Sequence, residues 1–334
     1  MNILLTSAGR RSYLVKYFKE AIEPLAGKLH VSNSTELCSS FKFADHTLVS
    51  PQIYDKEYIQ VILSYCRKHK ITLVIPLFDI DLLVLSRNKR VFLKNGITVL
   101  VSNAQIIELC NDKWLTYNFL TKNGFDTPKS YIEISLLKSD LDRNLIHYPL
   151  ILKPRWGMGS IGVYRADNME ELLFFNKYIQ KQINECYLKY ESSLTPDNRV
   201  IFQKMIAGEE YGLDIINDLN TNYSGTFVKR KIAMRSGETD ISELITNHRE
   251  LEEIGKAISA KLKHIGNLDV DILVEDNKFK VLEFNARFGG GYPFTHAAGV
   301  NLPKAIIDWL QKNQTDHLKI KTANRIQFKS IEII

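Results

Sequence analysis

The sequence predicts an α/β domain of Rossmann-like type followed by a region of α+β type. Over residues 1–105, strand-sized apolar runs alternate with helix-sized segments, as in a parallel sheet covered by helices. Beyond Tyr148, strands and helices come in blocks, and several strands follow one another directly, as in antiparallel sheets. A chain of 334 residues has room for two or three domains.

The first part opens with a strand, a turn of small residues and a helix, at residues 2–6, 7–11 and 13–21. Further strands are expected at 30–32, 72–76 and 98–101, and helices at 58–69 and 79–94. The turn has one glycine, Gly9, so it lacks the GxGxxG fingerprint of an NAD-dependent oxidoreductase. It is either a plain strand-to-helix turn or a loop that places N–H groups and two arginines near an anion.

The second part begins with a helix at 113–123, which ends at Asn123-Gly124. Strands are then expected at 148–153, 163–165, 200–205, 211–217 and 223–233, helices at 169–182 and 248–264, and a hairpin at 268–284. The segment 192–198 is the expected flexible loop.

The composition is that of a globular protein, with 45% hydrophobic and 25% charged residues. No apolar run approaches the roughly 20 residues of a membrane-spanning helix, so no membrane partner is expected. The net charge of +6 is spread along the chain, whereas nucleic-acid binding usually shows a basic stripe. The four cysteines, at 38, 66, 110 and 186, form no CxxC pair, and no signal peptide opens the chain. These features predict a cytoplasmic protein.

A glycine-rich segment joins two expected strands. Lys153 ends the first strand, and Gly157, Gly159 and Gly162 follow within nine residues. Glycines let the backbone approach a ligand and point its N–H groups at it, and Lys153 would add a positive charge there. The segment reads equally well as a clamp over a nucleoside triphosphate and as a glycine-containing hairpin. It is not a Walker A loop, because GxxxxGK[ST] is absent.

The expected hairpin carries acidic residues whose partners depend on the length of its loop. A three-residue loop would pair Asp271 with Glu283 and Asp269 with Asn285, so that all four lie on one face. A two-residue loop would turn Glu283 to the opposite face. Facing carboxylates repel unless a cation lies between them, and oxygen-only ligands suit Mg²⁺ or Mn²⁺. The alternative is a solvated acidic face.

Basic residues lie close to this hairpin in sequence or on a neighbouring strand. Arg287 follows it directly and could stabilise charge on a transferring phosphoryl group. Lys229, Lys231 and, if the strand runs on, Arg235 would share one face of the strand before it. That face is expected either to line a polyphosphate channel or to be solvated.

Taken in order, KPRWGMGSIGV, QKMIAGEEYGLD, KRK…R and DVDILV…VLEFNARFGGGYP resemble the ATP-grasp superfamily. The branch is similar to the large chain of carbamoyl-phosphate synthase, and TSAGRR resembles the Rossmann-like domain that precedes the fold in stand-alone members. The resemblance covers residues 1–310. It implies a pre-ATP-grasp domain at 1–105, a small subdomain with a glycine-rich lid at 106–200, and a subdomain with the metal site at 201–334.

The resemblance implies roles for individual residues. Lys113 and Lys153 match the lysines that contact ATP phosphates, and Glu210 matches the carboxylate on the ribose hydroxyls. Further matches are the lid, with Gly157, Gly159, Ser160 and Gly162; the adenine hinge, with Gln203, Lys204, Met205 and Ile206; the metal ligands Asp271, Glu283 and Asn285; and the arginines near the γ-phosphate, Arg287 and Arg235. Asp271 departs from the Gln or Glu usual in this branch, and its shorter side chain puts the binding of two metals in doubt.

The implied activity is ATP-dependent ligation of a small-molecule carboxylate to an amine through an acyl phosphate, with Mg²⁺ or Mn²⁺ as cofactor. Its catalytic residues would be Arg287, Arg235 and Lys153, and the resemblance allows a homodimer. No glutamine amidotransferase nucleophile is identified, which argues against carbamoyl phosphate synthesis. Arg10, Arg11 and Asp79 are the candidates to meet substrate charge, and Tyr292, Phe294 and His296 could shape the pocket. The rival interpretation is a non-catalytic nucleotide-binding sensor or pseudo-enzyme with the same fold.

Overall fold

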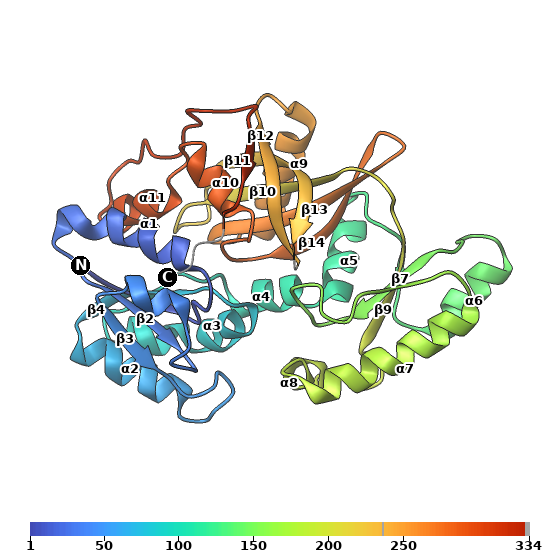
Figure 1. The fold of residues 1–334 in the computed structure, drawn as a ribbon, viewed down its shortest axis with the longest axis horizontal. Coiled ribbons are helices and arrows are strands. Elements are labelled where there is room, and N and C mark those ends of the chain that lie inside the picture. Colours follow the sequence, from blue (N-terminus) through green and yellow to red (C-terminus); the bar gives the residue numbers. More distant parts are fainter. Residues whose placement is uncertain (236, 331–334) are drawn as a thin grey trace.

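The structure is a computed structural model that describes residues 1–235 and 237–330, and its strands form three sheets (Figure 1). The first sheet is parallel, with the strand order β3-β2-β1-β4-β5. Its strands are β1 (Asn2–Thr6), β2 (Leu29–Asn33), β3 (His46–Val49), β4 (Ile71–Pro76) and β5 (Thr98–Val99). The helices among them are α1 (Ser12–Ile22), α2 (Tyr58–Lys68) and α3 (Asp79–Leu93), with 3₁₀ turns η1 (Glu23–Leu25) and η2 (Ser39–Phe43).

The strand order of this sheet reverses between β1 and β4. The chain leaves β1 toward β2 on one side of the sheet and returns to β4 on the other. Ligands of open α/β sheets bind at such switch points, outside the carboxyl ends of the strands. The loops that start there are 7–11, which leads into α1, and 77–78, which leads into α3.

The second sheet is antiparallel and small, with the order β6-β9-β7-β8. It consists of β6 (Ser130–Tyr131), β7 (Leu150–Pro154), β8 (Tyr164–Ala166) and β9 (Val200–Lys204), with helices α6 (Ile134–Asp142), α7 (Met169–Glu185) and α8 (Lys189–Ser192). Figure 1 shows this unit at one end of the molecule, and its apolar side chains form a core of their own. The whole of β9 pairs within this sheet, which therefore extends beyond residue 200 to Lys204.

The third sheet is antiparallel, with the order β14-β13-β10-β11-β12-β15. Its strands are β10 (Glu210–Asn217), β11 (Tyr223–Arg235), β12 (Glu238–Ile245), β13 (Gly266–Glu275), β14 (Lys278–Asn285) and β15 (Ile326–Phe328). The helices are α9 (Arg249–Leu262), α10 (Tyr292–Ala297) and α11 (Leu302–Leu310). Among the described residues, no helix is both long and apolar enough to cross a bilayer.

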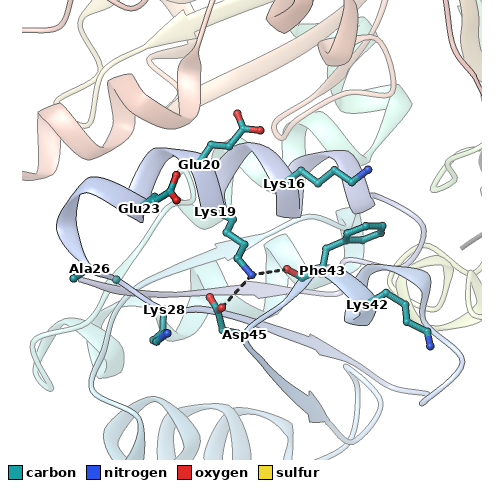
Figure 2. Close-up of a pocket in the computed structure, with 10 residues that line it drawn as sticks. Lys16, Lys19, Glu20, Glu23, Ala26, Lys28, Lys42, Phe43 and Asp45 are labelled. Carbon is teal, nitrogen blue, oxygen red and sulfur yellow. Dashed lines mark hydrogen bonds and ion pairs between the residues drawn. The ribbon is translucent and has the colours of Figure 1, made fainter.

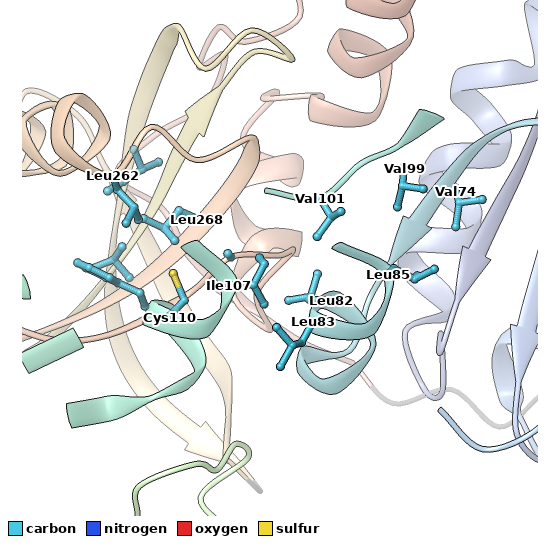
Figure 3. Packing of buried hydrophobic residues seen from close by; sticks show 14 of the residues in the cluster. Val74, Leu82, Leu83, Leu85, Val99, Val101, Ile107, Cys110, Leu262 and Leu268 are labelled. Atoms are coloured by element: carbon cyan, nitrogen blue, oxygen red, sulfur yellow. The ribbon is translucent and has the colours of Figure 1, made fainter. Parts of the chain in front are cut away.

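One apolar core joins the first sheet to the third. Helices α4 (Ala104–Asn111) and α5 (Lys113–Lys122) lie between them. Figure 3 shows Ile107 and Cys110 of α4 between Leu82 and Leu83 of α3 on one side and Leu268 of β13 on the other. Because protein cores are close-packed, this wedge fixes the switch point of the first sheet relative to the third sheet.

The expected fold class, α/β followed by α+β, agrees with this architecture, but several elements were not predicted. The clearest case is β12, whose buried face includes Thr239 and Ser242. Ser242 Oγ donates to the Arg230 carbonyl at 2.8 Å, so its burial is satisfied without an apolar side chain. The strand therefore lacks the apolar alternation by which strands are recognised.

Candidate functional site

The β13–β14 hairpin brings the predicted acidic residues together. It has the shorter of the two predicted loops, but its residues pair as the longer loop would require. Its turn has two residues, Asp276 and Asn277, with φ of 51° and 58°, which gives the left-handed backbone of a tight hairpin. That loop alone would place Asp271 opposite residue 282. A bulge next to Asp271 shifts the register, so Asp271 pairs with Glu283, and Asp269 pairs with Asn285. The prediction of facing carboxylates therefore agrees with the structure.

Lysines surround these carboxylates. Lys231 Nζ donates to Asp271 Oδ1 at 2.5 Å and to Glu210 Oε1 at 2.6 Å. Glu283 Oε2 lies 3.7 Å from Lys153 Nζ and 3.9 Å from Lys113 Nζ. Burial acts to raise the pKa of Glu283, but the nearby lysines lower it overall. Glu283 is thus held ionised, beside ammonium groups that could receive phosphate oxygens.

The glycine loop, residues 157–162, connects β7 to β8 above these lysines. Lys113 Nζ donates to the carbonyl of Gly157, which ties the start of α5 to the loop. At the base of the loop, Arg155 makes a buried ion pair with Asp112 at 2.7 Å, and Asp112 also caps α5 by accepting from Trp114 N. The base of the loop is therefore anchored by charge-assisted hydrogen bonds.

A cavity of about 410 Å³, which we call the hinge cavity, lies between the glycine loop and β13–β14. Its walls include these predicted residues: Lys113, Lys153, Gly157, Gly159, Ser160, Gln203, Lys204, Met205, Ile206, Glu210, Asp271 and Glu283. Residues from both antiparallel sheets meet here. The Gln203 side chain donates to Ser130 Oγ at 2.9 Å, and Lys204 pairs with Glu275 at 2.8 Å, so both are engaged with the protein.

A second cavity of about 220 Å³, which we call the Arg287 cavity, adjoins the first. The two cavities share Met158, Gly159, Met234, Gly237, Asp271 and Glu283. Besides Asn285 and Arg287, its walls include Arg11, Phe78 and Asp79 from the switch point of the first sheet. The cavity therefore joins the charged edge of the hairpin to the place where an α/β sheet ordinarily binds ligand.

Arg287 is held in place by groups from α3 and from the third sheet. Its Nε lies 2.9 Å from Asp79 Oδ1, its Nη2 donates to Asn285 Oδ1 at 3.4 Å, and its Nη1 lies 4.0 Å from Asp269 Oδ2. Burial acts to lower the pKa of Arg287, but Asp79 and Asp269 raise it overall. Burial beside Asp271 raises the pKa of Asp269 to about 7. Asp79, expected as a substrate-binding group, thus serves as the partner of Arg287.

Three predicted residues are not brought into these cavities as expected. Arg235 pairs with Asp240 at 2.6 Å and is half exposed, because bulges in β11 after Lys231 place Met234 on the cavity side instead. The expectation that Arg235 shares a face with Lys229 and Lys231 is therefore wrong. Gly162, at the end of the glycine loop, lines neither cavity. A Cβ added there would lie 3.1 Å from the Pro154 ring.

Lys229 and the third predicted residue, Arg10, also differ from the expectation. Lys229 reaches the wall of the Arg287 cavity, but it is buried and paired with Asp214, which makes it a structural cation. Arg10 is exposed and lines neither cavity. Its neighbour Arg11 is the member of the pair that reaches the site.

The aromatic residues expected to shape the pocket belong mainly to the core. Tyr292 is fully buried and donates to the Val300 carbonyl at 3.1 Å. The ring of His296 stacks on Tyr17 with centroids 3.6 Å apart, and burial lowers the pKa of His296 to about 4. Neither residue lines the two cavities, so the expectation that they shape the pocket is wrong.

Sequence reasoning missed several residues of the walls. Met158, Met234, Glu238 and Tyr187 all line the Arg287 cavity. Met234 could not be found because the bulges in β11 break the alternation of strand side chains. Tyr187 comes from the segment before α8, and its ring contacts Phe78 edge-on at 5.7 Å. This wall of the cavity forms where the unit of the small sheet packs against the switch point of the parallel sheet, and a contact of that kind leaves no pattern in the sequence.

A wider hollow of about 800 Å³ lies elsewhere, on α1 and the segment before β3 (Figure 2). Lys19 there reaches Asp45 at 3.0 Å and the Phe43 carbonyl at 3.4 Å, and Lys16 lies over the Phe43 ring at 4.4 Å. The hollow contains none of the predicted site residues. Its charged groups belong to the surface of the first domain.

The predicted metal ligands form a donor set of a particular kind. Within residues 1–235 and 237–330, no three His, Cys, Asp or Glu side chains gather into a group that would hold a metal by itself. The predicted set has two carboxylates, Asp271 and Glu283, and the amide of Asn285, all at one edge of the hairpin. Mg²⁺ commonly takes one or two carboxylates and completes its shell with water and phosphate oxygens. The residues present fit that ion.

Two protein families match the chain in sequence. The family described as "PylC-like, N-terminal domain" matches residues 3–100, and the family described as "ATP-grasp domain" matches residues 110–291. The two matches cover the parallel sheet and the two antiparallel sheets that form the cavities. They confirm the expected order of a Rossmann-like domain and an ATP-grasp fold.

Individual relatives are more distant. The carbamoyl phosphate synthase large chain of Pseudothermotoga lettingae is 23% identical over 229 residues, 66% of this chain and 20% of that protein. This chain thus spans about a fifth of the length of such relatives. The coenzyme gamma-F420-2:alpha-L-glutamate ligase of Methanococcus maripaludis is 27% identical over 209 residues, 60% of this chain and 67% of that protein.

Solved structures share the fold. The biotin carboxylase domain of Hydrogenobacter thermophilus 2-oxoglutarate carboxylase, a dimer in complex with MgADP, ADP and bicarbonate, superposes with a TM-score of 0.74. It is 16% identical in sequence, and the alignment covers 94% of this chain and 70% of that one. The likeness extends from the parallel sheet through both antiparallel sheets.

Proposed function

The chain belongs to the ATP-grasp family, and on this premise we propose that it is an ATP-dependent carboxylate–amine ligase acting through an acyl phosphate. The observation that carries the proposal is the convergence of Lys113, Lys153, Asp271 and Glu283 on the hinge cavity beneath the glycine loop. Residues from α5, β7, β13 and β14 contribute to this group, so their meeting is a property of the tertiary structure.

We assign ATP to the hinge cavity. Adenine would lie at the end of β9, where Gln203, Lys204, Met205 and Ile206 line the wall. Glu210 would receive the ribose hydroxyls, and it is already fixed by Lys231 at 2.6 Å. The phosphates would then extend toward Lys113 and Lys153. This direction leads to the junction with the Arg287 cavity, where the second substrate has room.

Asp271, Glu283 and Asn285 would hold Mg²⁺, which neutralises phosphate charge and lets a carboxylate approach another anion. In the first step, a carboxylate oxygen of the substrate forms a bond to the γ-phosphorus, and the bond from that phosphorus to ADP breaks. In the second, the amine forms a bond to the acyl carbon and phosphate leaves. Lys113 and Lys153 would bind the phosphoryl oxygens, and Arg287 would stabilise the oxyanion of the acyl carbon.

The glycine loop would serve as the lid. It covers the junction of the two cavities, since Met158 and Gly159 line both. Water must be kept from an acyl phosphate, because hydrolysis would waste ATP without forming the product. The names of two similar proteins support this chemistry. The relative from Methanococcus maripaludis is named as a glutamate ligase, and the similar biotin carboxylase domain was solved with MgADP.

The test is ADP release with a matrix of small carboxylates and amines in the presence of Mg²⁺, followed by mass analysis of the product. We expect ADP to appear only when both substrates are present, together with an amide. Glu283→Gln should reduce this turnover on the order of 100-fold or more, because it removes a metal-binding charge. Glu253→Gln, exposed on α9, is the matched control.

The rival interpretation, a nucleotide-binding sensor or pseudo-enzyme, makes a different prediction. It requires ATP binding in the hinge cavity without substrate-dependent ADP release across the whole matrix. The lysines and carboxylates favour the ligase, because a pseudo-enzyme usually loses such groups. Wild-type-like turnover in Glu283→Gln would contradict the metal role of Glu283, whereas ATP binding without substrate-dependent ADP release in wild type would contradict the ligase.

Three further features are proposed on the same basis. The division at residues 105 and 200 is tested by limited proteolysis. A homodimer, suggested by the dimeric biotin carboxylase domain, is tested by light scattering at several protein concentrations. A cytoplasmic location is tested by fractionation of cells that express the protein.

A further inference from the structure

Within the described part of the chain, the Arg287 cavity contains one cation that no carboxylate pairs with. Of the cations on its walls, Lys229 pairs with Asp214, Lys231 with Asp271 and Glu210, and Arg287 with Asp79. Among the described residues, Arg11 makes no ion pair, and its single hydrogen bond goes from Nη1 to the Leu77 carbonyl. A guanidinium has five N–H donors, so most of its binding capacity remains unused.

The surroundings of Arg11 make this unpaired charge costly. It is partly buried, and burial together with the charge of Arg287 lowers its pKa overall, although Asp79 and Glu238 act in the opposite direction without pairing with it. A desolvated charge next to a like charge is unfavourable unless an anion compensates it. Such an arrangement is stable in a folded protein when a ligand supplies the missing anion. The arginine is also well placed for this, because the Leu77 carbonyl fixes its side chain.

A second unpaired donor lies in the same neighbourhood. The hydroxyl of Tyr13 is buried and has no hydrogen-bond partner among the described residues. Burial raises its pKa to about 12, and Arg11, Glu238 and Arg287, which all line the cavity, act on it. An unsatisfied buried hydroxyl costs free energy, but Tyr13 does not line the cavity, so Arg11 alone carries the argument for an anion there.

The location of these donors indicates which end of a substrate they would meet. Arg11 comes from the loop after β1, at the switch point of the parallel sheet. The residues assigned to the metal, Asp271 and Glu283, come instead from β13 and β14 and also border the hinge cavity. An anion bound to Arg11 would therefore be met by a group that has no assigned part in the reaction.

We propose that the Arg287 cavity takes a small substrate with an anionic group that does not react, a carboxylate or a phosphate, and that Arg11 binds this group. Arg11 is then a specificity-determining residue. The inference rests on the proposed ligase, because it places the reacting end of the substrate beside the metal carboxylates. Its core, an anion subsite at Arg11, can be tested without turnover.

The binding experiment uses protein saturated with MgADP, so that the nucleotide site is occupied. Thermal shifts are measured with matched probes: succinate against butyrate, and 2-phosphoglycolate against glycolate. A charge-assisted hydrogen bond to arginine contributes roughly 10- to 100-fold in affinity, so the probe with the extra anion should stabilise wild type at correspondingly lower concentration. A larger difference between succinate and butyrate would indicate a carboxylate subsite. A larger difference between 2-phosphoglycolate and glycolate would indicate a phosphate subsite.

Arg11→Met should abolish that difference, whereas Arg10→Met, which removes the adjacent exposed charge, should preserve it. The proposal is overturned if neither pair differs in wild type, or if a difference survives in Arg11→Met. Failure of the ligase looks different: the probes then bind in an Arg11-dependent way, but no carboxylate or amine bearing an extra anion yields ADP and amide.

Discussion

At the scale of single residues, the site depends on charges that hold one another in place. Lys231 bridges Glu210 and Asp271, and Lys113 and Lys153 flank Glu283. A bound phosphate oxygen would compete with the carboxylates for these ammonium groups. A metal ion would compete with the ammonium groups for the same carboxylates. Because the charges are buried together, their energies are larger than those of surface pairs and are sensitive to removal of one partner.

Lys153→Ala should weaken ATP binding by about tenfold or more, because a buried charge that would contact phosphate is lost. Lys181→Ala is the matched control. Lys181 lies on α7 outside both cavities, and its exposed side chain pairs with Glu185 at 3.8 Å. Calorimetric titration with MgATP measures both affinities, and equal losses in the two variants would refute the assigned role of Lys153.

His264 should make the protein less stable in acid. It is fully buried, its ring lies 3.0 Å from the Ile215 carbonyl, and burial lowers its pKa from 6.5 to about 4. The unfolded chain therefore binds the proton first, so stability is full above pH 6.5 and falls as the pH drops toward 4. The loss reaches about 3 kcal/mol for this group. In His264→Gln, denaturant midpoints should fall less steeply between pH 6.5 and 4; an unchanged slope would rule out this assignment.

At the scale of elements, two hairpins decide the shape of the site. The bulge in β13–β14 turns Asp271 and Glu283 toward each other, and the bulges in β11 put Met234 into the cavity walls in place of Arg235. Gly237, directly before β12, also meets the glycine loop. A Cβ added to Gly237 would lie 3.0 Å from the carbonyl carbon and oxygen of Gly159.

Gly237→Ala should therefore disturb the seating of the glycine loop over both cavities. Leakage of water would appear as ADP released in excess of product, by several-fold over wild type. Gly124→Ala is the matched control, since Gly124 has the same φ of +77° but nothing within 4 Å of an added Cβ. Both variants carry the same backbone strain. An ADP-to-product ratio near one in Gly237→Ala would contradict the contact's role.

At the scale of the whole molecule, the parallel sheet and the six-stranded sheet act as one body. They share the core around α4, and the buried Asp79–Arg287 pair links α3 to the segment after β14. The small sheet has its own core and carries the glycine loop between β7 and β8. This arrangement allows the loop to move with the small sheet while the Arg287 cavity keeps its other walls.

Asp79→Asn should lower the free energy of unfolding by about 3–5 kcal/mol, because it leaves the buried Arg287 without its counter-charge. Glu108→Gln breaks the exposed pair with Arg87, 2.6 Å long, and should cost less than about 1 kcal/mol. Urea unfolding of both variants measures the difference. Similar losses would mean that the link between the two sheets contributes little.

How much of the fold could be predicted depends on where the apolar pattern was regular. The strand at 2–6 matches β1, and the helix at 79–94 matches α3 to within a residue, because both bury a clear apolar face. The strand β12 was missed because buried Thr239 and Ser242 hide its alternation. The helices α4 and α6 were also missed, since their boundaries carry no strong sequence signal.

The sequence by itself determined the ingredients: the glycine loop, the two lysines, the acidic hairpin and their order along the chain. Only the tertiary structure decided which of them meet. It turned Arg235 outward, committed Lys229 to Asp214, and left Arg11 facing a cavity while its neighbour Arg10 faces solvent. The physical reason is that bulges and packing between sheets depend on contacts between distant residues, whereas motifs and periodicity record only neighbours along the chain.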